Sequence, residues 1–313
     1  MKTILKIGTR GSPLALAQTD LLIGLLRAKH PNLRQDGAVE IVKIVTSGDR
    51  IQDRPLSEAG GKGLFTKEIE DALLAGTIDC AVHSMKDMPT QLPTGLTIPC
   101  LLSREDPRDA FFSLKAKTLD ELPPGSVVGT ASLRRQAIIL ARRPDLKTAL
   151  LRGNVGTRLK KLEESVVDAT ILAVAGLKRL GQGHLVKHIL EPDVMLPAVA
   201  QGAIGIEVRK NDDRVNNLLS EVHCPMTELR VTAERAFLGV MDGSCKTPLA
   251  ALMSVPDSQR QARLDVLVAR PDGSDVRKAS FTGTVSTLRD AQQLGERAGQ
   301  EIRTKLPRGY LAV

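Results

Sequence analysis

Apolar residues in the first hundred positions switch between strand-like runs and helical periodicity. Leu5-Lys6-Ile7 predicts a short strand, and leucines at helical spacing follow from Leu14 to Leu26. Between them, Ser12 stands where a helix N-cap is expected, and Pro13 fits the first helical position. The pattern then predicts a strand over 39–45, a helix over 65–75 and a strand over 78–85. Strands that alternate with helices are typical of an α/β sheet.

The same alternation returns after a polar stretch at 103–107, which we interpret as a crossing between domains. Strands are predicted over 126–129, 148–151 and 169–175, and helices follow from near Ser132, after Asn154 and from Gly176. Residues 128–134 repeat the strand, Gly-Thr, Ser and Arg features of residues 7–12. We therefore expect two similar α/β lobes that face each other.

The C-terminal third has a different pattern. A helix is predicted over 227–241, then a hairpin with strands at 264–269 and 276–282 around a Pro-Asp-Gly-Ser turn, then an amphipathic helix over 288–306. This is an α+β unit. We predict three domains, formed by residues 1–102 with 203–220, by 106–198 and by 223–313.

Amino-acid composition limits the kinds of molecule that the protein is expected to bind. The 313 residues include 42% hydrophobic but only 2% aromatic residues, and the formal net charge is +8. This charge suits an anionic partner, but single-stranded nucleic acid usually stacks on aromatic side chains, which are scarce here. No apolar run approaches the roughly 18 residues of a membrane span, and the N-terminal stretch lacks the apolar core of a signal peptide. We expect a cytoplasmic protein that binds neither nucleic acid nor membrane.

Arginine recurs where a predicted strand turns into a helix. The residues concerned are Arg10, Arg134 with Arg135, Arg152 with Arg158, and Arg179 beside Lys178. A helix start favours anions, so two arginines in a first turn are unfavourable unless an anion lies between them. The guanidinium group grips carboxylates through two parallel hydrogen bonds, and ligands of such sheets bind beyond the carboxyl ends of the strands. The pattern indicates a polycarboxylate ligand; solvated surface arginines are the alternative.

Asp87 and Cys245 are the other candidates for chemistry. Asp87 follows a buried strand and precedes Met-Pro, so it is either a turn residue or a partly enclosed carboxylate that moves protons and stabilises positive charge. Cys245 lies in a Gly-Ser-Cys-Lys loop, where Lys246 favours a thiolate. An incidental loop thiol is the alternative.

Three other features carry less weight. The Gly-Gly-Lys-Gly run at 60–63 lacks the first Gly and the Ser or Thr of a phosphate-binding loop, so we interpret it as a flexible lid containing Lys62. His184 and His188 have helical spacing but no further ligand at a recognisable distance, and we predict no metal site. His83 lies within a predicted strand and is expected to be a satisfied core residue.

Long motifs through most of the chain resemble those of the porphobilinogen deaminase family. The segments that carry the resemblance, in the family's order, are residues 7–16, 60–65, 82–89, 104–109, 129–136, 151–158, 173–181 and those around 201–203. Over the last seventy residues the resemblance rests mainly on the loop with Cys245 and the general layout. Family members often have Gly at position 244 and an uncharged polar residue at 246, whereas this chain has Ser244 and Lys246.

The resemblance implies two lobes like the type II periplasmic binding proteins and a C-terminal α+β domain. It also implies a transferase that joins four porphobilinogen molecules head to tail, releases ammonia and yields hydroxymethylbilane. The growing chain would stand on a dipyrromethane cofactor that a thioether attaches to Cys245. Each pyrrole carries acetate and propionate groups, so the arginine pattern agrees with this ligand. The family also implies a monomer.

The resemblance assigns roles residue by residue. Asp87 falls at the catalytic carboxylate, which also contacts the cofactor, and Lys62 falls in the covering loop. The residues at cofactor-binding positions are Lys86, Ser132, Arg134, Arg135 and Arg158. Those at substrate-binding positions are Arg10, Ser12, Arg152, Arg158 and Arg179. A non-catalytic polycarboxylate-binding protein of the same two-lobed fold is the alternative, although it gives Cys245 no role.

Overall fold

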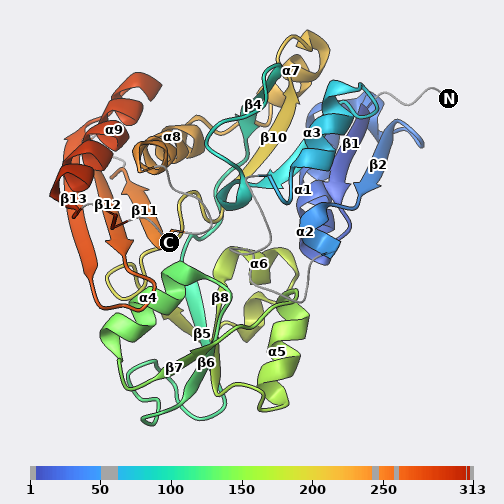
Figure 1. Cartoon of the computed structure of the whole chain (residues 1–313). Helices are drawn as coiled ribbons and strands as arrows, with labels where there is room; N and C mark the ends of the chain where they lie inside the picture. The colour runs from blue at the N-terminus through green and yellow to red at the C-terminus, as the bar shows by residue number, and fades with distance from the viewer. Residues whose placement is uncertain (1–4, 51–62, 242–246, 257–260, 308, 311–313) are drawn as a thin grey trace. The chain divides into compact units, whose positions relative to one another are not determined.

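The computed structural model describes residues 5–50, 63–241, 247–256, 261–307 and 309–310 (Figure 1). The chain divides into two compact units. The first consists of residues 1–54, 59–105 and 203–228, and the second of residues 55–58, 106–202 and 229–313. Within the described ranges, no helix combines the length and the apolar character that crossing a bilayer requires.

A five-stranded mixed sheet forms the centre of the first unit. Its strands are β1 (Leu5–Arg10), β2 (Val39–Ile44), β3 (Cys80–Ser84), β4 (Leu96–Leu101) and β10 (Ile204–Arg209). They lie in the order β2-β1-β3-β10-β4. The first strand pairs in parallel with β2 and β3, whereas β10 runs antiparallel to β3 and β4. The carboxyl ends of β1 and β3 therefore meet at one edge of the sheet.

Helices cover both faces of this sheet. They are α1 (Pro13–Lys29), α2 (Ser47–Arg50), α3 (Lys67–Leu74) and α7 (Asp213–Ser220), with 3₁₀ turns η1 (Pro31–Arg34) and η2 (Met85–Asp87). One face packs Leu22 of α1 and Leu219 of α7 against β-strand residues such as Val82. The other face packs Ile69 and Leu73 of α3. Neighbouring positions of β3 face opposite clusters, with Cys80 and Val82 in the first and Ala81 in the second, as a sheet covered on both sides requires.

The second unit repeats this topology in its own five-stranded sheet. The strands are β5 (Asp109–Ser113), β6 (Val127–Gly129), β7 (Lys147–Ala149), β8 (Ala169–Ala173) and β9 (His188–Leu190). Their order is β7-β6-β8-β5-β9, with β6 parallel to β7 and β8, and β5 antiparallel to β8 and β9. The helices are α4 (Leu133–Arg142), α5 (Val155–Glu163) and α6 (Val174–Arg179), followed by the 3₁₀ turn η3 (Gly183–Leu185).

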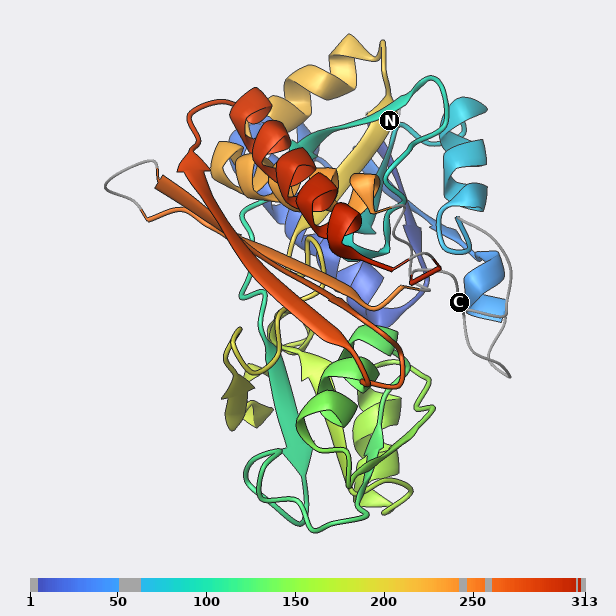
Figure 2. The same cartoon turned by 60° about the vertical axis from the view of Figure 1, so that its left-hand side comes forward.

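A three-stranded antiparallel sheet and two long helices complete the chain. The strands are β11 (Leu249–Ser254), β12 (Gln261–Ala269) and β13 (Val276–Thr284), and the helices are α8 (Pro225–Val240) and α9 (Leu288–Lys305). Figure 2 shows α9 lying across the long β12–β13 hairpin. The turn of this hairpin packs on α4 of the second unit, where Gln136 donates to the Pro271 carbonyl at 3.2 Å.

These elements confirm the predicted fold class, with two mixed α/β sheets and a C-terminal α+β segment. The predicted caps are also confirmed: the Ser12 hydroxyl accepts from the Ala15 N–H, and the Ser132 hydroxyl accepts from the Arg135 N–H. The prediction of a strand to residue 175 is wrong, because α6 begins at Val174. The run Ala-Val-Ala-Gly is apolar throughout, so its periodicity does not distinguish a buried strand end from a buried helix start.

Two glycines of α9 allow it to lie close to α8. A Cβ atom on Gly295 would lie 2.1 Å from the Ala233 carbonyl oxygen, and one on Gly299 would lie 2.6 Å from Val240 Cβ. A backbone oxygen cannot turn aside as a flexible side chain can. The spacing of the two helices therefore depends on glycine at these positions.

We predict that Gly295→Ala destabilises the protein by about 1–3 kcal/mol, the usual cost of overpacking. Gly239→Ala in α8 is the matched control, because nothing lies within 4 Å of a Cβ there. That change should be neutral or stabilising by up to about 1 kcal/mol through helix propensity. Urea unfolding of both variants measures the difference. Equal stability of the two variants would contradict this account of the helix contact.

Candidate active site

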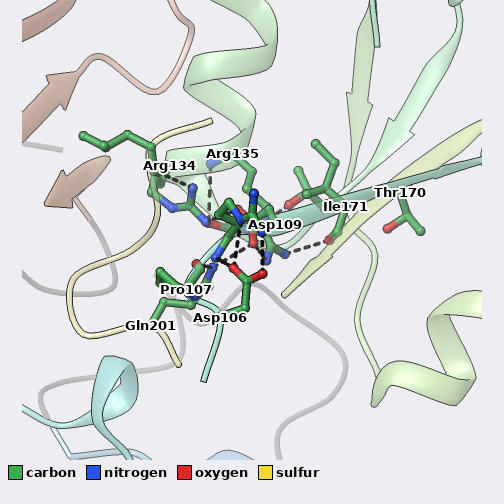
Figure 3. Close-up of polar contacts among 12 residues, drawn as sticks. Asp106, Pro107, Asp109, Arg134, Arg135, Thr170, Ile171 and Gln201 are labelled. Carbon is green, nitrogen blue, oxygen red and sulfur yellow. Dashed lines mark hydrogen bonds and ion pairs between the residues drawn. The ribbon is translucent and has the colours of Figure 1, made fainter. Parts of the chain in front are cut away.

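The adjacent arginines Arg134 and Arg135 enter the interior of the second unit instead of facing solvent. Both lie in the first turn of α4 and are about 95% buried, with exposed fractions of 4% and 5%. Figure 3 shows both guanidinium groups directed at Asp109, the first residue of β5. Arg134 Nη2 donates to Asp109 Oδ2 at 2.8 Å, and Arg135 Nη2 donates to Oδ1 at 2.7 Å. The anion expected between these arginines is therefore a side chain of the protein.

Backbone carbonyls accept from two further donors of the cluster. Arg134 Nη1 donates to the Leu196 carbonyl at 2.7 Å, and Arg135 Nη1 donates to the Ile171 carbonyl at 2.8 Å. Arg134 Nε is buried and has no hydrogen-bond partner among the described residues. Two guanidinium groups and one carboxylate leave a net positive charge in this interior, so the cluster retains the capacity to attract a further anion.

The protonation of Asp109 follows from its neighbours. Burial acts to raise the pKa of this carboxyl, but the charges and hydrogen bonds of Arg135 and Arg134 outweigh burial and hold the pKa well below its ordinary value. Burial also lowers the pKa of Arg134. Asp109 is thus a permanent anion at neutral pH. Sequence reasoning did not identify it, although an acid at the start of the apolar run Ala-Phe-Phe is a signal of a buried charge.

The chain segment that connects β9 to β10 also contacts this cluster. Gln201 Nε2 donates to Asp109 Oδ1 at 2.9 Å and to the Pro107 carbonyl at 2.7 Å. The preceding residue, Ala200, has φ +58°, and its N–H donates to the buried carboxylate of Glu234 at 2.7 Å. The Gly202 carbonyl accepts from Arg179 Nη2 at 2.6 Å. The half-buried Arg179 is therefore anchored to the same loop that holds Asp109.

The other predicted residues of the second unit lie at helix starts. Ser132 is half-buried and caps α4. Asn154 caps α5 through its contact with the Thr157 N–H, and Arg158 Nε donates to the Gly153 carbonyl at 2.9 Å. Arg152 and Arg158 are both half-buried. The predicted pattern of arginine beside a strand-to-helix turn is present at each of these places.

A pocket in the first unit contains three of the predicted site residues. Arg10, Ser12 and Asp87 line it at the carboxyl ends of β1 and β3, together with apolar and polar residues of α1 and of the segment before α3. Asp87 ends the short η2 turn that follows β3 and is half-buried. Lys86 beside it is exposed. Asp87 is therefore both a turn residue and part of the pocket lining.

Asp49 holds the guanidinium group of Arg10. Arg10 Nε lies 3.2 Å from each oxygen of this carboxylate, and Nη2 forms a further contact. The same guanidinium group lies 4.2 Å from the centre of the Phe65 ring. Burial raises the pKa of Asp49, but hydrogen bonds from Arg10 and from the Thr46 hydroxyl lower it overall. Sequence reasoning missed Asp49, because its Ser-Gly-Asp setting is typical of an ordinary polar turn.

Lys62 and Cys245 lie outside the described residues. The structure brings Arg10, Ser12 and Asp87 together within the first unit and Ser132, Arg134 and Arg135 together within the second. In the described part of the chain, no group of three or more His, Cys, Asp or Glu residues is arranged to hold a metal ion.

Comparison with known proteins identifies the family to which the chain belongs. A sequence model described as the porphobilinogen deaminase dipyromethane cofactor binding domain matches residues 5–217, and one for the C-terminal domain of the same enzyme matches residues 228–304. The chain belongs to the porphobilinogen deaminase family. The predicted resemblance is thereby confirmed.

Full-length relatives agree with this assignment. The chain is 54% identical to the chloroplastic porphobilinogen deaminase of Oryza sativa subsp. japonica, over 98% of this chain and 86% of the relative. It is also 54% identical to the porphobilinogen deaminase of Paracoccus denitrificans, over 98% of this chain and 96% of the relative. Family membership makes the protein a transferase that polymerises porphobilinogen to hydroxymethylbilane with dipyrromethane as its cofactor. It gives no support to a non-catalytic binding protein.

Solved structures show a more distant likeness. A lipoprotein of the YaeC family from Enterococcus faecalis is 12% identical with a TM-score of 0.44, over 72% of this chain and 93% of that one. A periplasmic substrate-binding protein from Coxiella burnetii is 15% identical with a TM-score of 0.41, over 71% of this chain and 93% of that one.

The Asp109 cluster generates a prediction on stability. Asp109→Asn should destabilise the protein by about 3–5 kcal/mol, because it leaves two buried guanidinium groups without their counter-charge. Since the pKa of Asp109 is lowered by folding, its contribution is complete above the unfolded value near 4 and is lost as the pH falls below it. The difference in unfolding free energy between wild type and variant should therefore be constant above about pH 5 and shrink below about pH 4.

Urea unfolding over this pH range measures the difference. Asp120→Asn is the control, because Asp120 forms its ion pair with Arg142 at the exposed surface, where solvent screens the pair. The control should lose much less stability. Equal losses in the two variants would show that Asp109 is no more important than a surface acid.

Proposed function

We propose that Asp87 is the catalytic carboxylate of this transferase and that the pocket of the first unit receives porphobilinogen. The observation that carries this proposal is the presence of Asp87, Arg10 and Ser12 in one pocket at the ends of two adjacent parallel strands. Ligands of such sheets bind beyond the carboxyl ends of the strands. A carboxylate there stabilises a positive charge that develops on the substrate and accepts hydrogen bonds from pyrrole N–H groups.

The proposed substrate contacts beyond Asp87 are Arg10, Ser12, Arg152, Arg158 and Arg179. Guanidinium groups would grip the acetate and propionate groups of the substrate through paired hydrogen bonds. Arg10 supports this role because Asp49 and Phe65 fix the position of its guanidinium group. A fixed cation loses little conformational freedom on binding, which favours orientation of the substrate.

The cofactor would be held by Lys86, Asp87, Ser132, Arg134, Arg135 and Arg158 and joined to Cys245 by a thioether. The residues present fit a carboxylate-bearing group: the Arg134–Asp109–Arg135 cluster has a net positive charge, and Arg134 Nε is a buried donor without a partner among the described residues. When bound, dipyrromethane supplies the nucleophilic pyrrole carbon on which the product chain is built. The protein's part is to bind and orient that group and to exclude water.

The remaining assignments are the lid role of Lys62, the three-domain division, a cytoplasmic location and a monomeric state. The domain division has partial support from the boundary between the two family matches, which falls between residues 217 and 228. The names of relatives differ on location, because the Oryza sativa protein is called chloroplastic and the Paracoccus denitrificans protein is not. These assignments stay predictions.

We predict that the intact mass of the purified, denatured protein exceeds the chain mass by one dipyrromethane group. Cys245→Ser should abolish this addition because a hydroxyl is a poor nucleophile at neutral pH. Cys224→Ser is the matched control, since Cys224 is a half-buried free cysteine elsewhere in the chain and should leave the addition intact. An unmodified mass in active wild-type enzyme would refute the tethered cofactor.

We further predict that Asp87→Ala lowers kcat for porphobilinogen consumption by about 100-fold or more, because both charge stabilisation and proton handling are lost. The cofactor should remain attached, as intact mass can verify. Asp20→Ala, a change to an exposed acid on α1, should leave kcat unchanged. A wild-type rate in the Asp87 variant would rule out the assigned role.

A further inference from the structure

His83 occupies an unusual position beneath the pocket of the first unit. It lies in β3 directly opposite Gly205 of β10, and Ala81 of β3 lies opposite Glu207. Side chains opposite one another and two residues along share a face of the sheet, so His83 and Glu207 are diagonal neighbours. His83 Nε2 lies 3.0 Å from Glu207 Oε2, and the side chains are 5% and 0% exposed.

The Glu207 carboxylate has little else to stabilise it. Neither of its oxygens, nor His83 Nε2, has a hydrogen-bond partner among the described residues, so the pair is held by charge and proximity. A buried carboxylate without hydrogen bonds is strongly unfavourable unless a counter-charge compensates it. The imidazole of His83, with Nε2 at 3.0 Å from Glu207 Oε2, can supply such a charge when it holds a proton.

A third titratable group completes the cluster. Glu70 of α3 is 7% exposed, and burial together with the charge of Glu207 raises its pKa, while the charge of His83 opposes this shift. Glu70 Oε1 also has no partner among the described residues. His83, Glu207 and Glu70 thus form one buried cluster of proton-binding side chains.

The cluster adjoins the proposed reaction site. His83 lines the same pocket as Asp87, which lies only four residues later in the chain. The charged groups around His83 are Glu207 of β10 and Glu70 of α3 on its own face, with Arg10 of β1 and Asp87 of η2 in the pocket. His83 is buried, as expected of a core residue, but its partner is a carboxylate and the residue also lines the pocket.

We propose that His83, backed by Glu207 and Glu70, holds the proton that each condensation step requires, and this rests on the proposed function of the pocket. A neutral amine of the bound substrate takes that proton, and the C–N bond then breaks with its electron pair on nitrogen, so that ammonia leaves. The new C–C bond then forms, and the attacking pyrrole carbon gives up its C–H proton while the electron pair restores the ring. One proton is supplied and one is returned, so the cluster ends each step unchanged.

His83→Gln and Glu207→Gln test this proposal in the complete, cofactor-bearing enzyme. Each change removes a titratable group but keeps a polar side chain of similar size. Both variants should lower kcat by about 100-fold, the usual contribution of a proton-transfer group, while KM changes less than about threefold. Both should also flatten one limb of the pH profile of kcat. His184→Gln, a change to an exposed histidine of the second unit, should alter neither.

A kcat within threefold of wild type in either variant would overturn the proposal. So would a reduced kcat with an unaltered pH profile, since a merely structural role predicts that result. An intact-mass measurement of each variant verifies that the cofactor is still attached. If His83→Gln cannot be purified as a folded protein, the kinetics of Glu207→Gln alone test the proposal. A failure of the proposed function can be told apart from a failure of the His83 proposal. If the proposed function is wrong, Asp87→Ala keeps the wild-type rate whatever the result for the His83 variant.

Discussion

Two guanidinium groups enter the interior of the second unit, and a single buried carboxylate makes that possible. Asp109 accepts hydrogen bonds from Arg134, Arg135 and Gln201, so its two oxygens fix both arginines and the loop that braces them. A guanidinium group taken from water without such a partner would be prohibitively costly. The first turn of α4, with its cap at Ser132, can therefore direct positive charge inward and hold it at a defined place.

The sequence alone was sufficient to predict the two helix caps and the family. Ser12 and Ser132 were identified as caps because Ser before an apolar periodic run is a strong local signal, and both hydroxyls bond the expected N–H groups. The recurrence of arginine at strand ends indicated an anion site, and the motifs identified the family. The caps and the family assignment succeeded because each depends on residues that are neighbours in the chain. The anion site that the arginines indicate stays a prediction.

Features that depend on distant residues were not predictable in this way. Asp109 is 25 residues from Arg134, and Glu207 is more than 100 residues from His83, so no local pattern links the members of either cluster. In the chain, residues 106–202 of the second unit come between β4 and β10, which returns to the first sheet as an antiparallel strand. An acid inside the apolar strand Ile-Gly-Ile-Glu-Val was the one available signal for the Glu207 site.

The buried carboxylate of Glu234 has a consequence for the proposed attachment point of the cofactor. Glu234 accepts both from Ala200 N–H and, at 2.9 Å, from Met253 N–H of β11. Ala200 precedes the glutamine that bonds Asp109, and β11 begins four residues after Cys245. One side chain of α8 thus ties β11 to the loop that carries Gln201, and through Gln201 to Asp109. The positions of β11 and of the arginine cluster therefore depend on the same buried carboxylate.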